Sequence, residues 1–164
     1  MMPAPEPLML GALALPLAAT PLIVAARRWP NLREAVTLAT AAALLACVLA
    51  LWRAVAAGAR PGLVLLQVLP GLELALRLEP LGMLFALVAS GLWIVNSLYS
   101  IGYMRGNGEA NQTRFYVCFA LSLAAAMGIA FAGNLFTLFL FYELLTLVTY
   151  PLVTHHGSDK ARQG

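Results

Sequence analysis

Residues 115–154 read FYVCFALSLAAAMGIAFAGNLFTLFLFYELLTLVTYPLVT and contain one charged side chain, Glu143. Gly133-Asn134 divide this stretch into two apolar runs, 115–132 and 135–154, each long enough to cross roughly 30 Å of hydrocarbon as a helix. Because a break of this length allows only a tight turn, we expect the two helices to pack antiparallel. The stretch therefore predicts two membrane-spanning helices, the second carrying a carboxyl group within the membrane.

Three further runs of this kind precede it, at Leu8–Ala26, Ala35–Ala57 and Leu81–Met104. The chain is 62% hydrophobic and 10% charged, whereas a soluble domain carries about 25% charged residues. This fraction of charged residues is too small to form the polar surface of a soluble protein, but it suits a chain whose surface faces lipid. Glu6 and the lack of basic residues before the first run favour a retained helix over a secretory signal. We expect an all-α transmembrane fold of about five spanning helices, forming a single domain over residues 1–164.

Residues 62–79, between the second and third runs, have a different pattern. Leu72–Glu79 alternates apolar and mostly polar residues, which is typical of a half-buried strand. Pro70-Gly71 fits the two central positions of a type II turn. We therefore expect an extramembrane β-hairpin here. An amphipathic helix at the interface is the alternative, and the prolines oppose it.

The net charge of +3 does not indicate nucleic-acid binding, because the basic residues lie in the gaps between apolar runs. We expect the lipid bilayer as partner and no nucleic acid. Cys47 and Cys118 lie inside apolar runs and are interpreted as small hydrophobic residues. The sequence has no metal-ligand spacing, P-loop, nucleophile elbow or dinucleotide fingerprint. We expect no metal, no cofactor and no enzymatic active site in this chain.

Glu143 is the candidate for proton transfer. It is the ninth residue of its run, which places it roughly 12 Å from the start of the helix. A charged carboxylate at that depth costs about 2.5–3.5 kcal/mol on insertion scales, so it must be neutral, paired, or turned toward protein or water. Thr146 and Tyr150 share its helical face and are candidate path residues. The alternative is a neutral glutamic acid that only packs between helices.

Other polar positions allow two interpretations. His155 and His156 could relay protons at neutral pH, but adjacent histidines cannot share a helical face, and histidines at an interface often have no role. Pro151 frees the carbonyl of Leu147, either for transport or for helix shape alone. The serines of the third run, Ser90, Ser97 and Ser100, favour close helix packing.

Four segments resemble a known family: EPLGMLF at 79–85, LYSIGYMRG at 98–106, GNLFTLFLFYELLT at 133–146 and TYPL at 149–152. They are similar to the antiporter-like proton-translocating membrane subunits shared by respiratory complex I, membrane-bound hydrogenases and Mrp-type cation/proton antiporters. The segment at 133–146 looks most similar to the D-type subunits of Mrp antiporters. The resemblance covers about residues 75–157.

The resemblance implies a larger subunit built from two inverted helix repeats, of which this chain is the N-terminal portion. Glu143 matches the family's fifth-helix glutamate, which pairs with a lysine on a later helix that has no counterpart in these residues. Glu79 stands where relatives commonly have aspartate, which preserves the charge.

The function this implies is the N-terminal fragment of a proton-translocating subunit of a multisubunit monovalent cation/proton antiporter. Its partners would be other membrane subunits, protons and Na⁺ or K⁺. One alternative is an antiporter-like subunit of a complex I-type NADH:quinone oxidoreductase or a membrane-bound hydrogenase. Another, of a different class, is a structural or non-functional truncated membrane subunit.

The basic residues predict the orientation in the plasma (inner) membrane. With the N-terminus outside, the inner segments hold seven of them and the outer segments three: Arg27, Arg28, Arg33, Arg105, Arg114, Lys160 and Arg162 against Arg53, Arg60 and Arg77. A reporter fused after Arg162 should therefore lie in the cytoplasm, and one inserted at Gly71 should lie outside. Labelling of the C-terminal tail from the periplasm would contradict this orientation.

Overall fold

The computed structural model describes residues 5–154 of the chain, and the predicted fold class is confirmed in it. Five helices are long and apolar enough to cross a membrane. They are α1 (Pro5–Ala25, followed by the short 3-10 turn η1, Ala26–Arg28), α2 (Pro30–Ala56), α3 (Pro80–Gly106), α4 (Gln112–Ala130) and α5 (Leu135–Val153). A hairpin of β1 (Gly62–Leu69) and β2 (Leu72–Arg77) connects α2 to α3.

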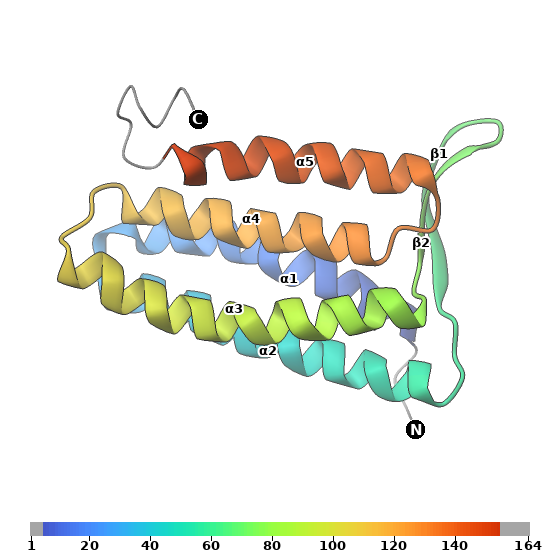
Figure 1. The fold of residues 1–164 in the computed structure, drawn as a ribbon, viewed down its shortest axis with the longest axis horizontal. Coiled ribbons are helices and arrows are strands. Elements are labelled where there is room, and N and C mark those ends of the chain that lie inside the picture. Colours follow the sequence, from blue (N-terminus) through green and yellow to red (C-terminus); the bar gives the residue numbers. More distant parts are fainter. Residues whose placement is uncertain (1–4, 155–164) are drawn as a thin grey trace.

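The helices lie side by side and alternate in direction (Figure 1). Helices α1 and α3 each pack against both α2 and α4, so these four form a bundle, and α5 lies along the outside of α4. The hairpin marks one end of the molecule, called here the hairpin end. The α1–α2 and α3–α4 connections lie at the opposite end, called the loop end. Arg27, Arg28 and Arg33 lie at or next to the first connection, and Arg105 and Arg114 lie in the helix turns next to the second. Which side of the membrane the loop end faces stays a prediction.

Small residues allow the bundle helices to approach closely. Ser90, Ser97 and Ser100 of α3 are all buried. A side chain at Gly82 of α3 would collide with the backbone carbonyl of Ala130 in α4. In a membrane, where lipid is as apolar as leucine, such close packing is a main source of helix association.

Helix α2 begins five residues earlier than its apolar run predicts, at Pro30 instead of residue 35. Proline is well suited to the first turn of a helix, where its missing N–H group is not needed. Helix α4 likewise begins at Gln112, not residue 115, and ends at Ala130, not residue 132. The correction at α2 matters for the site, because it moves Arg33 and Glu34 from a predicted loop into a helix.

The predicted hairpin is confirmed. The two strands pair antiparallel, from Gly62 opposite Arg77 to Leu69 opposite Leu72. Gly71 has a φ angle of +85°, and a type II turn requires such a positive angle at its third residue.

The second edge of β2 is also paired, which the sequence did not predict. The N–H group of Arg77 donates to the carbonyl of Phe131 at 2.7 Å, and that of Gly133 donates to the carbonyl of Ala75 at 2.8 Å. A Cβ atom at Gly133 would lie 2.9 Å from this carbonyl oxygen, so the position has no room for a side chain. The α4–α5 turn is thus hydrogen-bonded to the hairpin.

Asn134 joins this turn to the first turn of α5. Its side-chain oxygen accepts from the N–H group of Thr137 at 2.8 Å, and its amide nitrogen donates to the carbonyl of Glu73 at 2.8 Å. The hydroxyl of Thr137 in turn accepts from the N–H group of Ala75 at 2.9 Å. These bonds fix where α5 begins relative to β2.

Replacing Asn134 by alanine should therefore lower the free energy of unfolding by about 1 kcal/mol or more, since a helix cap of this kind contributes about that much. Unfolding of the purified protein in mixed detergent micelles measures the change. Asn107→Ala is the matched control, because the Asn107 side chain, at the end of α3, makes no hydrogen bond with a described residue. Equal losses in the two variants would contradict the anchoring role of Asn134.

Candidate functional site

Helix α5 is the least covered of the five helices. Only 6% of the residues in the apolar stretch of α5 are buried inside the described structure, against 50% in the apolar stretch of α4. Its less exposed residues, among them Phe141, Leu145 and Val148, recur at helical spacing. The ring of Phe141 lies so close to Gly128 of α4 that a side chain there would collide with it. Helix α5 therefore packs on α4 along one stripe, and the remaining faces are open.

Glu143 lies on an open face of α5, eight residues after Leu135 and so roughly 12 Å along the helix. Thr146 and Tyr150 are exposed as well, on the same side of the helix as their spacing requires. The Thr146 hydroxyl donates to the carbonyl of Tyr142 at 3.0 Å. Glu143 forms no hydrogen bond or ion pair with any residue of 5–154. Its carboxyl group is thus available to a partner outside these residues.

The sequence also marked Pro151 and the pair His155 and His156 as polar or irregular positions near the end of this helix. Helix α5 continues through Pro151 to Val153, so the proline does not end it. His155 and His156 lie outside the described residues.

A charged cluster at the loop end was not predicted from the sequence. It consists of Arg33 and Glu34 of α2, Arg105 of α3 and Tyr116 of α4. Arg105 holds both carboxylate oxygens of Glu34: its Nε donates to Oε1 at 3.0 Å, and its Nη2 donates to Oε2. The Glu34 side chain is 6% exposed. Bidentate arginine–carboxylate pairs are among the stronger hydrogen-bonded contacts in proteins. This pair therefore connects α2 to α3.

Arg33 ties α2 to α4 in the same cluster. Its guanidinium donates to Gln112 Oε1 at 2.7 Å and to Thr113 Oγ1 at 3.1 Å, and lies 5.1 Å from the centre of the Tyr116 ring. It also lies 3.6 Å from Glu34 Oε1. Two arginines that remain protonated and one clamped carboxylate suit a fixed connection between helices, not a group that exchanges protons. Pro30 is the signal that could have found this cluster, because it marks the true start of α2.

Removing the Glu34 charge should destabilise the bundle, because Arg33 would stay buried without its neighbouring negative charge. We expect Glu34→Gln to lower the free energy of unfolding by about 3 kcal/mol. In a double-mutant cycle, Arg105→Gln should cost much less in the Glu34→Gln background than alone. The exposed pair Arg60–Glu79, 4.0 Å apart, is the control, and Glu79→Gln should change stability little. Additive effects of the Glu34 and Arg105 substitutions would show that the pair is not a connection.

No family model matches the chain. Individual relatives do match, over 84 residues that make up 51% of the chain. They are the A1 subunits of the Na⁺/H⁺ antiporter of Staphylococcus aureus, 34% identical in strain bovine RF122 / ET3-1 and 33% identical in strain JH9. The match covers 10% of each relative, so the chain spans about a tenth of the length of the curated relatives it matches.

A solved structure matches more of the chain. It is a chain of the membrane-bound sulfane sulfur reductase (MBS), an archaeal respiratory membrane complex, with a TM-score of 0.72 and 25% sequence identity. The similarity covers 87% of this chain and 22% of that one. Because the Staphylococcus relatives are A1 subunits, the predicted likeness to D-type subunits stays a prediction. Over 84 residues the chain is thus similar to the A1 subunits of a Na⁺/H⁺ antiporter, and its fold is similar to part of a subunit of a respiratory membrane complex.

Proposed function

We propose that the chain is the N-terminal part of a proton-translocating subunit of a multisubunit monovalent cation/proton antiporter, with Glu143 as its protonatable group. The observation that carries the proposal is the position of Glu143, deep in a membrane-spanning helix and on a face that residues 5–154 leave uncovered. The distant relationship to antiporter subunits supports it.

The exposed carboxyl group of Glu143 requires protein or water around it in the membrane. Facing lipid, an ionised Glu143 would cost about 2.5–3.5 kcal/mol or more. Other helices of the subunit, or neighbouring subunits, would cover this face and turn the carboxyl group toward protein or water. In such a site the carboxyl can take up a proton when it is isolated and release it when a cation approaches.

The two hydroxyl groups extend this site toward the loop end. Thr146 and Tyr150 follow Glu143 by about 4.5 Å and 10.5 Å along the helix axis. The Thr146 hydroxyl donates a hydrogen bond to the carbonyl of Tyr142, which leaves its oxygen lone pairs available to accept another hydrogen bond. With the N-terminus outside, this line of groups leads from the middle of the membrane toward the cytoplasm.

A second candidate is a transport subunit of a redox-driven complex, as in complex I or a membrane-bound hydrogenase. The likeness to a chain of a respiratory membrane complex favours it. The role of Glu143 would be the same in both, while the redox chemistry would belong to other subunits. The source of the driving energy therefore distinguishes the two.

Glu143→Gln keeps the shape and hydrogen-bonding capacity of the side chain but cannot release a proton. In membrane vesicles that hold the whole complex, we expect normal assembly and a fall in proton transport of at least about tenfold. Glu143→Asp should keep partial activity, since it preserves the carboxyl group but withdraws it by one methylene. A fluorescent ΔpH dye measures transport, and blotting of the complex measures assembly.

Glu79→Gln is the matched control, because it removes an exposed carboxylate at the hairpin end and should leave transport unchanged. If Glu143→Gln transports as well as the wild type across the working pH range, the carboxyl group only packs between helices. Transport started by Na⁺ or K⁺ without an electron donor supports the antiporter. Transport that starts only with an electron donor supports the redox-driven complex, and no transport by the wild type supports a structural or non-functional subunit.

A further inference from the structure

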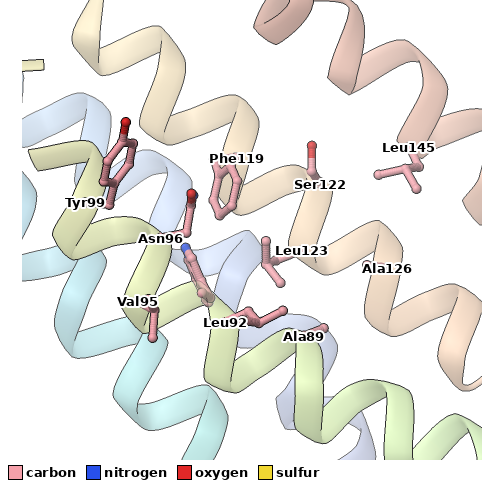
Figure 2. A pocket seen from close by; sticks show the side chains of 11 residues that line it. Ala89, Leu92, Val95, Asn96, Tyr99, Phe119, Ser122, Leu123, Ala126 and Leu145 are labelled. Atoms are coloured by element: carbon pink, nitrogen blue, oxygen red, sulfur yellow. The ribbon is translucent and has the colours of Figure 1, made fainter. Parts of the chain in front are cut away.

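A groove of about 650 Å³ runs between α3, α4 and α5 (Figure 2). Helix α3 forms one wall, with Leu92 and Val95 among its lining residues, and Phe119 and Ala126 of α4 line the floor. Helix α5 contributes Leu145 at the opposite edge. The lining is almost entirely apolar, and the groove lies within the membrane-spanning part of all three helices.

One polar side chain of α3 that lines this groove, Asn96, has no hydrogen-bond partner in the described chain. The indole N–H of Trp93 also has no hydrogen bond there, but it is fully buried and out of reach of a group in the groove. The amide of Asn96, half-buried, makes no hydrogen bond with any residue of 5–154. Ser122, in contrast, donates to the carbonyl of Cys118 at 2.9 Å. The groove therefore offers the amide donors of Asn96, which remain to be satisfied.

Lipid does not suit these donors. Asn96 lies ten residues before Gly106, roughly 15 Å from the end of a helix that is about 40 Å long. Acyl chains at this depth carry no acceptor, and an unsatisfied polar group in hydrocarbon is costly. A helix that presents a carbonyl or hydroxyl acceptor would accept a hydrogen bond from the Asn96 amide. Small lining residues such as Ala89 and Ala126 allow its backbone to approach closely.

The length of the similar solved chain indicates where such a helix comes from. The likeness covers 87% of this chain but only 22% of that one, so most of that polypeptide lies outside the matched region. We propose that a transmembrane helix from the part of the same subunit beyond these 164 residues fills the groove and accepts a hydrogen bond from Asn96. This inference rests on the proposed function, in which the chain is part of a longer subunit.

Photo-crosslinking in native membranes that contain the whole complex tests the proposal. The photoreactive residue p-benzoylphenylalanine replaces Val95, which lines the groove, or Leu98, which is exposed on α3 outside it. From position 95 we expect a cross-link to a helix of the same polypeptide, identified by mass spectrometry of the joined peptides. Position 98 should not join to that helix. Cross-links from position 95 to lipid alone, to another subunit or to a second copy would each overturn the proposal.

A second substitution tests the polar contact. Asn96→Leu should lower the yield of the cross-link from position 95 by about fivefold, as expected from loss of an interhelical hydrogen bond. Ile94→Leu, on the same helix but outside the groove lining, should not change it. An unchanged yield in Asn96→Leu would overturn the role of Asn96. These results do not depend on transport, so failure of the groove proposal is distinguishable from failure of the role proposed for Glu143.

Discussion

The backbone hydrogen bonds between β2 and the α4–α5 turn determine how the other parts of the molecule are placed. Through the bonds of Arg77 to Phe131 and of Gly133 to Ala75, a hairpin that lies between α2 and α3 in the sequence also holds α4 and α5. Asn134 and Thr137 extend this connection into the first turn of α5. The hairpin therefore sets the level at which α5, the helix that carries Glu143, begins.

The bundle and α5 satisfy their polar groups in different ways. In the bundle, buried charges are paired within the chain, as in the contacts of Glu34 with Arg105 and of Arg33 with Gln112 and Thr113. On α5 the one charged side chain has no such contact with residues 5–154, and Asn96, which lines the neighbouring groove, makes no hydrogen bond with them either. Since the bilayer interior offers no water to replace these contacts, Glu143 and Asn96 are the groups for which the helices proposed above would supply partners.

The sequence predicted the parts of the fold that depend on local patterns. Apolar runs located the five helices, and Pro70-Gly71 located the hairpin turn. Glu143 was selected as the candidate site residue because it is the single charged residue in an apolar run, and its role stays a prediction. The start of α2 was wrong because the apolar run begins at residue 35, whereas Pro30 begins the helix. Because Arg33 and Glu34 were therefore assigned to a loop, the charged cluster that they form with Arg105 and Tyr116 was not predicted. The pairing of β2 with residues 131–134 and the groove arise only from contacts between segments distant in the sequence, which no local pattern contains.

The anchoring of α5 has a mechanical consequence. Bonds from β2 hold its first turn, whereas the charged cluster at the opposite end joins α2, α3 and α4 and does not include α5. Within the described chain α5 is hydrogen-bonded to the hairpin only at its start, and it packs on α4 with Phe141 against Gly128. If α5 tilted about Asn134, its displacement would grow with distance from that residue: a tilt of about 5° would move the backbone at Glu143 by roughly 1 Å and the end of the helix by more than twice as much. Small angular changes at the hairpin would be converted into shifts of the carboxyl group comparable to the difference between a formed and a broken hydrogen bond.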